Sequence, residues 1–167
     1  MTSRTLADGA ILRPARPGDE EGILAGIHGL ARYEREPDAV HNTVGALTET
    51  LFGDDPKAFA HVVVHEERVV GIAIWFLTYS TWIGRHGVWL EDLHVDESHR
   101  GRGYGRALIA ELARVCVERG YSRLEWTVLD WNAPAIAFYR SLAAVPMSEW
   151  TTQRLVGEEL SRLAAGA

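Results

Sequence analysis

The stretch Arg100-Gly101-Arg102-Gly103-Tyr104-Gly105 is the feature of this sequence that decides the fold. It follows an apolar segment at residues 88–95 and precedes a helical pattern of apolar residues. A strand, a glycine-rich turn and a helix together describe an anion site, because glycine lets the backbone approach a ligand and free N–H groups at the helix start point at it. Arg100, Arg102 and Arg106 add positive charge around the turn. The pattern predicts a bound pyrophosphate.

Two nucleotide-binding loops are weaker explanations of the same stretch. The dinucleotide fingerprint would need a glycine at position 106, where this chain has Arg106. The ATP-type loop would end in Gly-Lys followed by Ser or Thr, and that ending is absent here. A tight connection without any ligand remains the structural alternative.

Working outward, the periodicity of the chain predicts a mixed α/β fold with the element order β-α-α-β-β-β-α-β-α-β. Before the turn we expect a strand at residues 10–14, helices starting near residue 19 and covering 43–52, and strands at 59–65, 69–79 and 88–95. After it we expect a helix that ends at Gly120, a strand at 124–129, a helix from 133 to about 142, a last strand at 150–156 and a frayed tail.

The bulk composition predicts one globular domain over residues 1–167, with a core at about 10–157 and a C-terminal tail at 158–167. At 47% hydrophobic residues, including six Trp, the chain can bury one substantial core. A single cysteine, Cys116, cannot form an internal disulfide, residues 1–10 lack the pattern of a secretory signal, and no apolar run approaches the roughly 20 residues that span a bilayer. We therefore expect a cytoplasmic protein with no membrane partner.

The charge balance favours a cationic small molecule over nucleic acid as a partner. The formal net charge is −6, from 23 acidic and 17 basic residues, so the field around the molecule attracts cations. An acidic surface that only maintains solubility is the alternative. His61 and His65 do not predict a metal pair, because on a strand they would lie about 13 Å apart at roughly 3.3 Å per residue.

The glycine-rich turn resembles the Arg/Gln-x-x-Gly-x-Gly/Ala signature of the GNAT superfamily of N-acetyltransferases, with Arg100, Gly103 and Gly105 at its defining positions. The resemblance implies a GNAT-type α/β fold, a mixed and mostly antiparallel central sheet with flanking helices, and acetyl-CoA as co-substrate without a metal. It also implies that the N–H of Val95 polarises the thioester carbonyl. The implied donor-binding residues are Leu93, His94, Val95, Arg100, Gly101, Arg102, Gly103, Tyr104, Gly105, Arg106, Asn132 and Tyr139.

A second motif, at residues 131–139, resembles the Asn-to-Tyr motif that follows the next strand in this superfamily. The resemblance implies that Asn132 contacts the CoA arm and that Tyr139 faces the thioester sulfur. A phenol, with a pKa of about 10, can give a proton to a thiolate whose conjugate thiol has a pKa of about 8.5. A half-buried core aromatic is the alternative role for Tyr139.

Three further segments, LARYE at 30–34, TYSTWIG at 78–84 and WLEDLHV at 89–95, resemble the diamine (spermidine/spermine) N-acetyltransferase branch and its thialysine-acetylating relatives. This branch implies a homodimer and an acceptor site built from Tyr33, Glu34, Trp82, Glu91 and Asp92. An ammonium must lose a proton before it attacks a thioester, so Glu91 and Asp92 are the candidate bases beside Tyr139 as the acid. Strand alternation sends their side chains to opposite faces, so both serve one site only if a bulge intervenes, and the resemblance implies one.

The most specific hypothesis is thus an N-acetyltransferase that acts on a diamine, a polyamine or a lysine-like small molecule. Acetylation of another amine, such as an amino acid, an aminoglycoside or a protein lysine, is the enzymatic alternative. A non-catalytic acyl-CoA-binding sensor module is the other alternative, although such a module needs neither Tyr139 nor the Glu91-Asp92 pair. The chain departs from the superfamily at residues 141–144, where a Gly is usual, and residues 146–153 align poorly with the branch.

Overall fold

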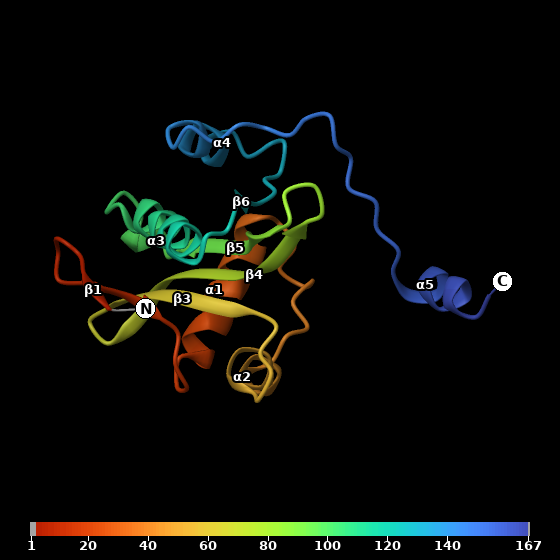
Figure 1. The fold of residues 1–167 in the computed structure, drawn as a ribbon. Helices are drawn as coiled ribbons and strands as arrows, with labels where there is room; N and C mark the ends of the chain where they lie inside the picture. Colours follow the sequence, from red (N-terminus) through yellow and green to blue (C-terminus); the bar gives the residue numbers. More distant parts are fainter. Residues whose placement is uncertain (1–2, 167) are drawn as a thin grey trace. The chain divides into compact units, whose positions relative to one another are not determined.

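In the computed structural model, which describes residues 3–166, the chain divides after Thr127 into two compact units. The first unit is built on a sheet whose strands lie side by side in chain order (Figure 1). Neighbouring strands are antiparallel, except that the last pair is parallel, so the predicted mixed and mostly antiparallel sheet is confirmed. The strands are β1 (Arg4–Thr5), β2 (Ile11–Pro14), β3 (Phe59–His65), β4 (Arg68–Ser80), β5 (Arg85–Val95) and β6 (Leu124–Glu125).

The helices of the first unit form where the sequence predicts them. Helix α1 (Glu20–Tyr33) begins with two acidic residues, which the helix dipole favours at that end. Helix α2 (Val44–Phe52) is capped by Thr43, whose hydroxyl accepts a hydrogen bond from the N–H of Ala46 at 3.2 Å. Helix α3 (Tyr104–Arg119) ends at Gly120, which has the left-handed backbone typical of a helix C-terminus.

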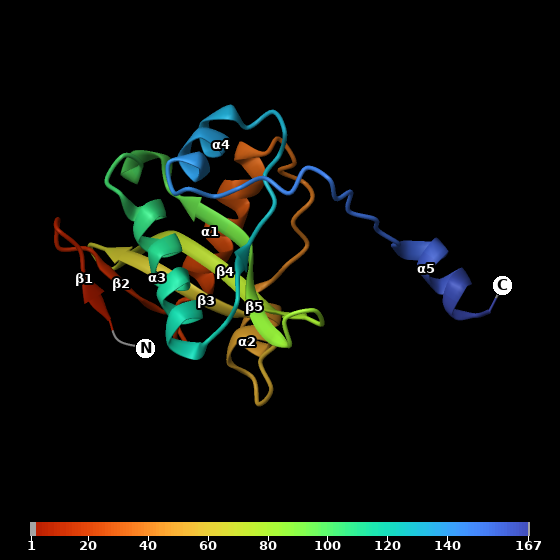
Figure 2. The same ribbon diagram turned by 45° about the horizontal axis from the view of Figure 1, so that its top comes forward.

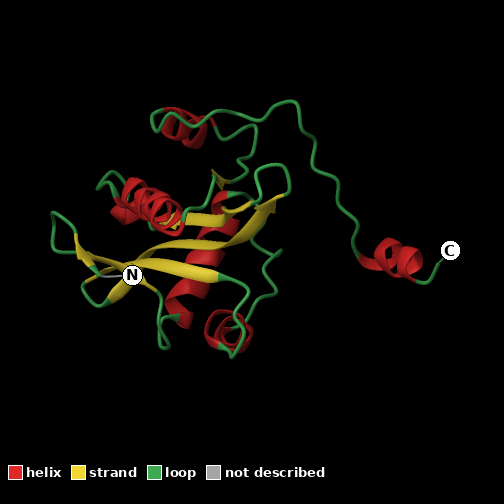
Figure 3. Cartoon of the chain, viewed as in Figure 1, coloured by secondary structure: helices red, strands yellow, loops and turns green. Residues whose placement is uncertain are grey.

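Helices cover both faces of this sheet (Figures 2 and 3). Helices α1 and α2 lie on one face and α3 lies on the other. The core beneath α1 and α2 is formed by the buried apolar residues Ile23, Leu47, Leu51, Ala60, Val62, Ile72 and Ile74. Burial of this apolar surface is the main force that holds the helices on the sheet.

Glycines on α1 allow this helix to lie close to β4 and β5. A Cβ atom at Gly26 would stand 2.8 Å from Cδ1 of Ile72, and one at Gly29 would stand 2.4 Å from Nε2 of His94. Both distances are shorter than packed atoms tolerate, so a side chain at either position would force the helix and the sheet apart. The last turn of α1, which carries Tyr33, is thereby held against β5.

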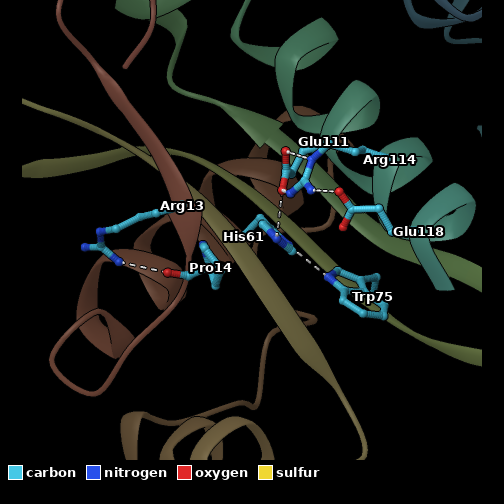
Figure 4. A network of polar contacts seen from close by, with 7 residues as sticks. All are labelled: Arg13, Pro14, His61, Trp75, Glu111, Arg114 and Glu118. Atoms are coloured by element: carbon cyan, nitrogen blue, oxygen red, sulfur yellow. Dashed lines mark hydrogen bonds and ion pairs between the residues drawn. The ribbon is translucent and has the colours of Figure 1, made fainter. Parts of the chain in front are cut away.

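A buried polar network joins the sheet to α3 (Figure 4). The indole N–H of Trp75 donates to Nδ1 of His61 at 3.1 Å, and Nε2 of His61 lies 3.8 Å from Oε1 of Glu111, which also pairs with Arg114. Burial lowers the pKa of His61 to about 4, so its imidazole is neutral at neutral pH. Because Nδ1 accepts the indole hydrogen bond, the imidazole proton sits on Nε2 and faces Glu111. His61 therefore serves packing between β3 and α3.

The chain after residue 123 differs from the prediction in three places. Of the strand predicted at 124–129, only the two residues of β6 form, because β5 offers them partners only at Val88 and Trp89. The predicted last strand at 150–156 is wrong: these residues are exposed and have no strand partner for their backbone groups. The predicted tail instead contains helix α5 (Gly157–Ala164), while residue 167 lies outside the described residues. The other helix of the second unit, α4 (Ala133–Arg140), is confirmed.

The N-terminal segment adds a strand that the sequence did not predict. The strand expected at 10–14 is β2, and β1 pairs with it across a turn in which the N–H of Leu6 donates to the carbonyl of Ala10 at 2.7 Å. A two-residue strand is too short to produce a recognisable alternation. Among the described residues, no helix combines the length and the apolar character needed to cross a membrane.

Candidate functional site

The glycine-rich turn leads from the 3-10 helix η1 (Glu97–His99) into α3. Gly101 and Gly103 have φ angles of 77° and 83°, in the left-handed region that favours glycine. A Cβ atom at either residue would meet no other atom within 4 Å, so the space beside the turn is open. Gly103 is the N-cap of α3, and Gly105 and Arg106 lie in its first turn, where N–H groups have no carbonyl partner within the helix. This backbone has the geometry of an anion site.

The arginines of the turn have different surroundings. The Nε–H of Arg100 donates to the carbonyl of Val95 at 3.2 Å, and its guanidinium lies over the ring of Tyr33, 5.0 Å from the ring centroid. Nη1 of Arg102 lies 3.8 Å from Oδ2 of Asp8. Arg100 therefore connects the turn to the ends of β5 and α1, while Arg102 faces the N-terminal segment.

Tyr104 fastens the start of α3 to the N-terminal segment. Its side chain is buried, and its hydroxyl donates to Oδ2 of Asp8 at 2.6 Å. This hydrogen bond is the main cause that lowers the pKa of the Asp8 carboxyl. Because the hydroxyl is engaged there, what Tyr104 offers a ligand at the turn is its backbone N–H.

The backbone of Val95 faces the free edge of β5. The N–H of Asp96 donates to the carbonyl of Val70 on β4 at 2.9 Å, and successive residues of an antiparallel strand direct their backbone groups to alternate sides. The N–H and carbonyl of Val95 therefore point away from β4. Within residues 3–127, β6 pairs with β5 only near Val88 and Trp89, so no strand covers this edge beside Val95. A carbonyl placed along the edge could accept a hydrogen bond from the Val95 N–H.

A bulge in β5 turns Asp92 to the face that α1 covers. Ile74 of β4 pairs with Asp92, whereas the next residue, Trp75, pairs with Leu90, so Glu91 is the extra residue. Directly opposed residues share one face of the sheet, and Ile74 belongs to the core beneath α1. The bulge implied by the resemblance is confirmed.

Three carboxylates gather at this bulge. Burial raises the pKa of Asp92 to about 6, and the negative charges of Glu91 and Glu34 add to the rise. Burial also raises the pKa of Glu34, which is the C-cap residue of α1. The structure thus brings together three of the predicted acceptor residues from two elements. A cation among them would relieve their mutual repulsion, so this acid cluster of Glu34, Glu91 and Asp92 suits a protonated amine.

One residue beside this cluster was not predicted from the sequence. The indole N–H of Trp89 donates to Oε2 of Glu91 at 2.8 Å and holds that carboxylate in place. Residues two apart on a strand share a face, so the Trp-Leu-Glu order of residues 89–91 was the available signal.

The other expected residues of the first unit lie further from the acid cluster or point elsewhere. His94 is buried against Gly29 of α1, and burial lowers the pKa of its imidazole. Leu93 alternates with His94 and faces the side of α3. Trp82 is 93% exposed in the turn between β4 and β5. This turn begins after Ser80, about 20 Å along β4 from Ile74, the residue opposite Asp92, at roughly 3.3 Å per residue. No group of three or more His, Cys, Asp or Glu that could hold a metal ion occurs in residues 3–166.

Asn132 and Tyr139 belong to the second unit. Oδ1 of Asn132 accepts a hydrogen bond from the N–H of Ala135 at 3.2 Å, so Asn132 caps α4. Tyr139 lies in the last turn of α4, with its ring centroid 5.3 Å from that of Phe138. Their roles toward a donor remain predictions from the motif.

Known proteins resemble this chain in sequence and in fold. The model of the acetyltransferase (GNAT) family matches residues 26–143, a stretch that extends into both units. Thialysine N-epsilon-acetyltransferases from Sus scrofa and Bos taurus are 35% and 36% identical to it over 167 residues, which cover 92% of this chain and 96% of each relative.

Among solved structures, an integron cassette protein from the mobile metagenome of V. cholerae matches with a TM-score of 0.78, covering 93% of this chain and 97% of that one. At 24% identity, this likeness shows a shared fold only. The family model and the two relatives show a shared chemistry as well as a shared fold, because each describes an acetyltransferase and matches most of the chain. This chain is therefore an N-acetyltransferase of the GNAT family.

Proposed function

We propose that this enzyme transfers the acetyl group of acetyl-CoA to the primary amine of a small cationic acceptor, a lysine-like molecule or a diamine. The observation that carries the proposal is the acid cluster of Glu34, Glu91 and Asp92, in which burial, together with the negative charges of the other two residues, raises the pKa of Asp92. Such a cluster is stabilised by an ammonium group. The relatives from Sus scrofa and Bos taurus are named for acetylation of thialysine at its ε position, which supports a lysine-like acceptor.

The glycine-rich turn supports acetyl-CoA as the donor. The open space beside Gly101 and Gly103 and the N–H groups at the start of α3 suit a pyrophosphate. The free edge of β5 at Val95 then suits the thioester end of the same molecule.

In the proposed reaction, Asp92 accepts a proton from the bound ammonium group. A carboxylate with a pKa of about 6 is ionised at neutral pH and is a stronger base than an ordinary aspartate, so it can accept the proton as the amine attacks. The amine nitrogen then forms a bond to the acetyl carbon while the carbon–sulfur bond breaks, and the Val95 N–H stabilises the negative charge on the carbonyl oxygen. Tyr139 gives its phenolic proton to the departing thiolate and regains one from the new amide nitrogen. The role of Tyr139 rests on the motif resemblance.

The proposal is tested by thiol release from acetyl-CoA with thialysine, lysine, diamines, polyamines and aminoglycosides as acceptors. The expected result is the highest kcat/KM with a lysine-like amine or a diamine. A higher value with an aminoglycoside would place the acceptor in another class. Tight CoA binding by calorimetry without turnover of any amine would instead favour a sensor module.

The branch resemblance supports a homodimer as the active form. Size-exclusion chromatography with light scattering should then give twice the mass of the 18.5 kDa chain. A monomer mass at the concentrations that support turnover would contradict this part of the proposal.

A further inference from the structure

A pocket of about 310 Å³ adjoins the glycine-rich turn on the side of the N-terminal segment. One wall is formed by Arg4, Leu6 and Ala7, and the other by the turn and the first half of α3. Three arginines line it: Arg4 from β1, Arg102 from the turn and Arg106 from the first turn of α3. Three cationic side chains around one opening favour an anionic guest.

The floor of the pocket is made by small residues of α3. Gly103, Ala107 and Ala110 all line it, and positions three and four apart on a helix lie on one face. Larger side chains at these positions would fill the space between α3 and the N-terminal segment. The small residues therefore keep the pocket open beside the arginines.

The N-terminal wall is held in place by contacts to the turn itself. The Tyr104 hydroxyl donates to Asp8 at 2.6 Å, and Arg102 lies 3.8 Å from the same carboxylate. Asp8 balances part of the positive charge of the three arginines. The charge of Arg4 also acts on Glu111, but Glu111 is already paired with Arg114. The pocket thus keeps a positive excess, and its position relative to the turn is fixed.

We infer that this pocket binds the phosphate monoester at the nucleotide end of the CoA donor, with Arg4 as a specificity-determining residue. The inference rests on the proposed function, because CoA carries this third phosphate on its ribose, separate from the pyrophosphate. The backbone N–H groups of the turn suit the pyrophosphate, whereas Arg4 comes from an element outside the turn and adds charge at the far wall. A phosphate monoester carries close to two negative charges at neutral pH, which suits an arginine cluster.

The test compares acetyl-CoA with acetyl-dephospho-CoA, which lacks only the ribose phosphate, at a fixed saturating amine. Wild-type enzyme should show a KM about tenfold lower for acetyl-CoA, the size of one good charge-assisted contact. Arg4→Gln should bring this ratio close to one. Arg68→Gln, which removes an exposed arginine outside the pocket, should leave the ratio as in the wild type.

Two results would overturn the inference: a wild-type ratio near one, or an Arg4→Gln variant that keeps the wild-type ratio. Failure of the proposed function looks different, because neither donor would then support turnover with any amine. In that case the affinities for CoA and dephospho-CoA, measured by calorimetry, test whether the pocket binds the ribose phosphate. Tighter binding of CoA by the wild type but not by Arg4→Gln supports it, and equal affinities refute it.

Discussion

The guanidinium of Arg100 lies over the ring of Tyr33, 5.0 Å from its centroid, and joins the glycine-rich turn to the last residue of α1. Arg100 also donates to the carbonyl of Val95, so one side chain contacts the ends of two elements. Glu34 of the acid cluster directly follows Tyr33. The turn that suits the donor and the cluster that suits the acceptor are therefore physically connected within the first unit.

Removing the ring of Tyr33 should weaken donor binding through Arg100. We expect Tyr33→Leu to raise the KM for acetyl-CoA about two- to fivefold, since an exposed cation–π contact contributes roughly 0.5–1 kcal/mol. Tyr33→Phe keeps the ring and is the matched control, with a KM close to that of the wild type. Steady-state kinetics on the three proteins checks this. An equal rise in both variants would show that the hydroxyl, and not the ring, is what matters.

Asp92→Asn should abolish most of the activity at neutral pH. Loss of a general base costs about 100-fold or more in kcat/KM, and the amide cannot accept the proton of the ammonium group. In the wild type, kcat/KM should fall below about pH 6, because protonation of Asp92 removes the base. A pH–rate profile on both proteins measures the two effects.

The matched control for Asp92→Asn is Glu97→Gln, which removes an exposed acid just beyond β5. This variant should keep both the rate and the acidic fall of the profile. If Asp92→Asn retained full activity, or if its profile still fell near pH 6, the base would have to be another group.

Asp92 should also lower the stability of the folded protein at neutral pH. Its folded pKa is raised, so the folded state binds the proton more tightly than the unfolded state, and the free energy of unfolding falls as the pH rises from about 4 to 6. Asp92→Asn should therefore stabilise the protein at about pH 8, by roughly 1–2 kcal/mol after allowance for solvent screening. At about pH 4 the gain should vanish. Urea denaturation at both pH values measures it.

Asp19→Asn provides a control of opposite sign. Burial acts to raise the pKa of Asp19, but hydrogen bonds from Arg13 at 2.6 and 2.8 Å and from the N–H of Arg16 lower it overall. The ionised Asp19 carboxylate therefore adds to the free energy of unfolding at pH values above its pKa in the unfolded chain, and this contribution is lost as the pH falls through its folded pKa. The substitution should thus destabilise the protein at about pH 8 by roughly 3 kcal/mol, and less at lower pH. A loss of stability at about pH 8 in both variants would contradict the assignment for Asp92.

Gly29→Ala should separate α1 from β5 and disturb the acid cluster. Its methyl group would stand 2.4 Å from Nε2 of His94, which is buried and cannot easily move aside. We expect a loss of about 1–3 kcal/mol in the free energy of unfolding, together with a higher KM for the amine.

Gly45→Ala is the matched control for this substitution. A methyl group at this position of α2 meets no atom within 4 Å, so the change should stabilise the helix by up to about 1 kcal/mol without affecting kinetics. Thermal unfolding and steady-state kinetics on Gly29→Ala and Gly45→Ala measure the two effects. Equal stability changes would show that the contact with His94 does not limit the approach of α1.

Local signals in the sequence were sufficient for helices α1 to α4, the central strands and the anion turn. Thr43 caps α2, Gly120 ends α3, and the left-handed Gly101 and Gly103 form the turn, because each of these features depends on residues a few positions away. The C-terminal segments at 124–129 and 150–156 could not be predicted in this way. A strand forms only where a partner strand is available, and that partner lies far away in the sequence.

The acid cluster and the arginine pocket were decided by tertiary structure. The sequence alone placed Glu91 and Asp92 side by side on the strand expected at 88–95, and the resemblance implied a bulge. The pairing of β4 with β5 and the packing of α1 placed Asp92 on the α1 face, near Glu34, where burial raises its pKa. Arg4 and Arg102 line one pocket for a related reason, since the short strand β1 at the start of the chain pairs with β2 and brings Arg4 to the pocket that the turn and α3 also line. Local patterns fix the backbone over a few residues, whereas burial and the distances between charges depend on contacts between segments far apart in the chain.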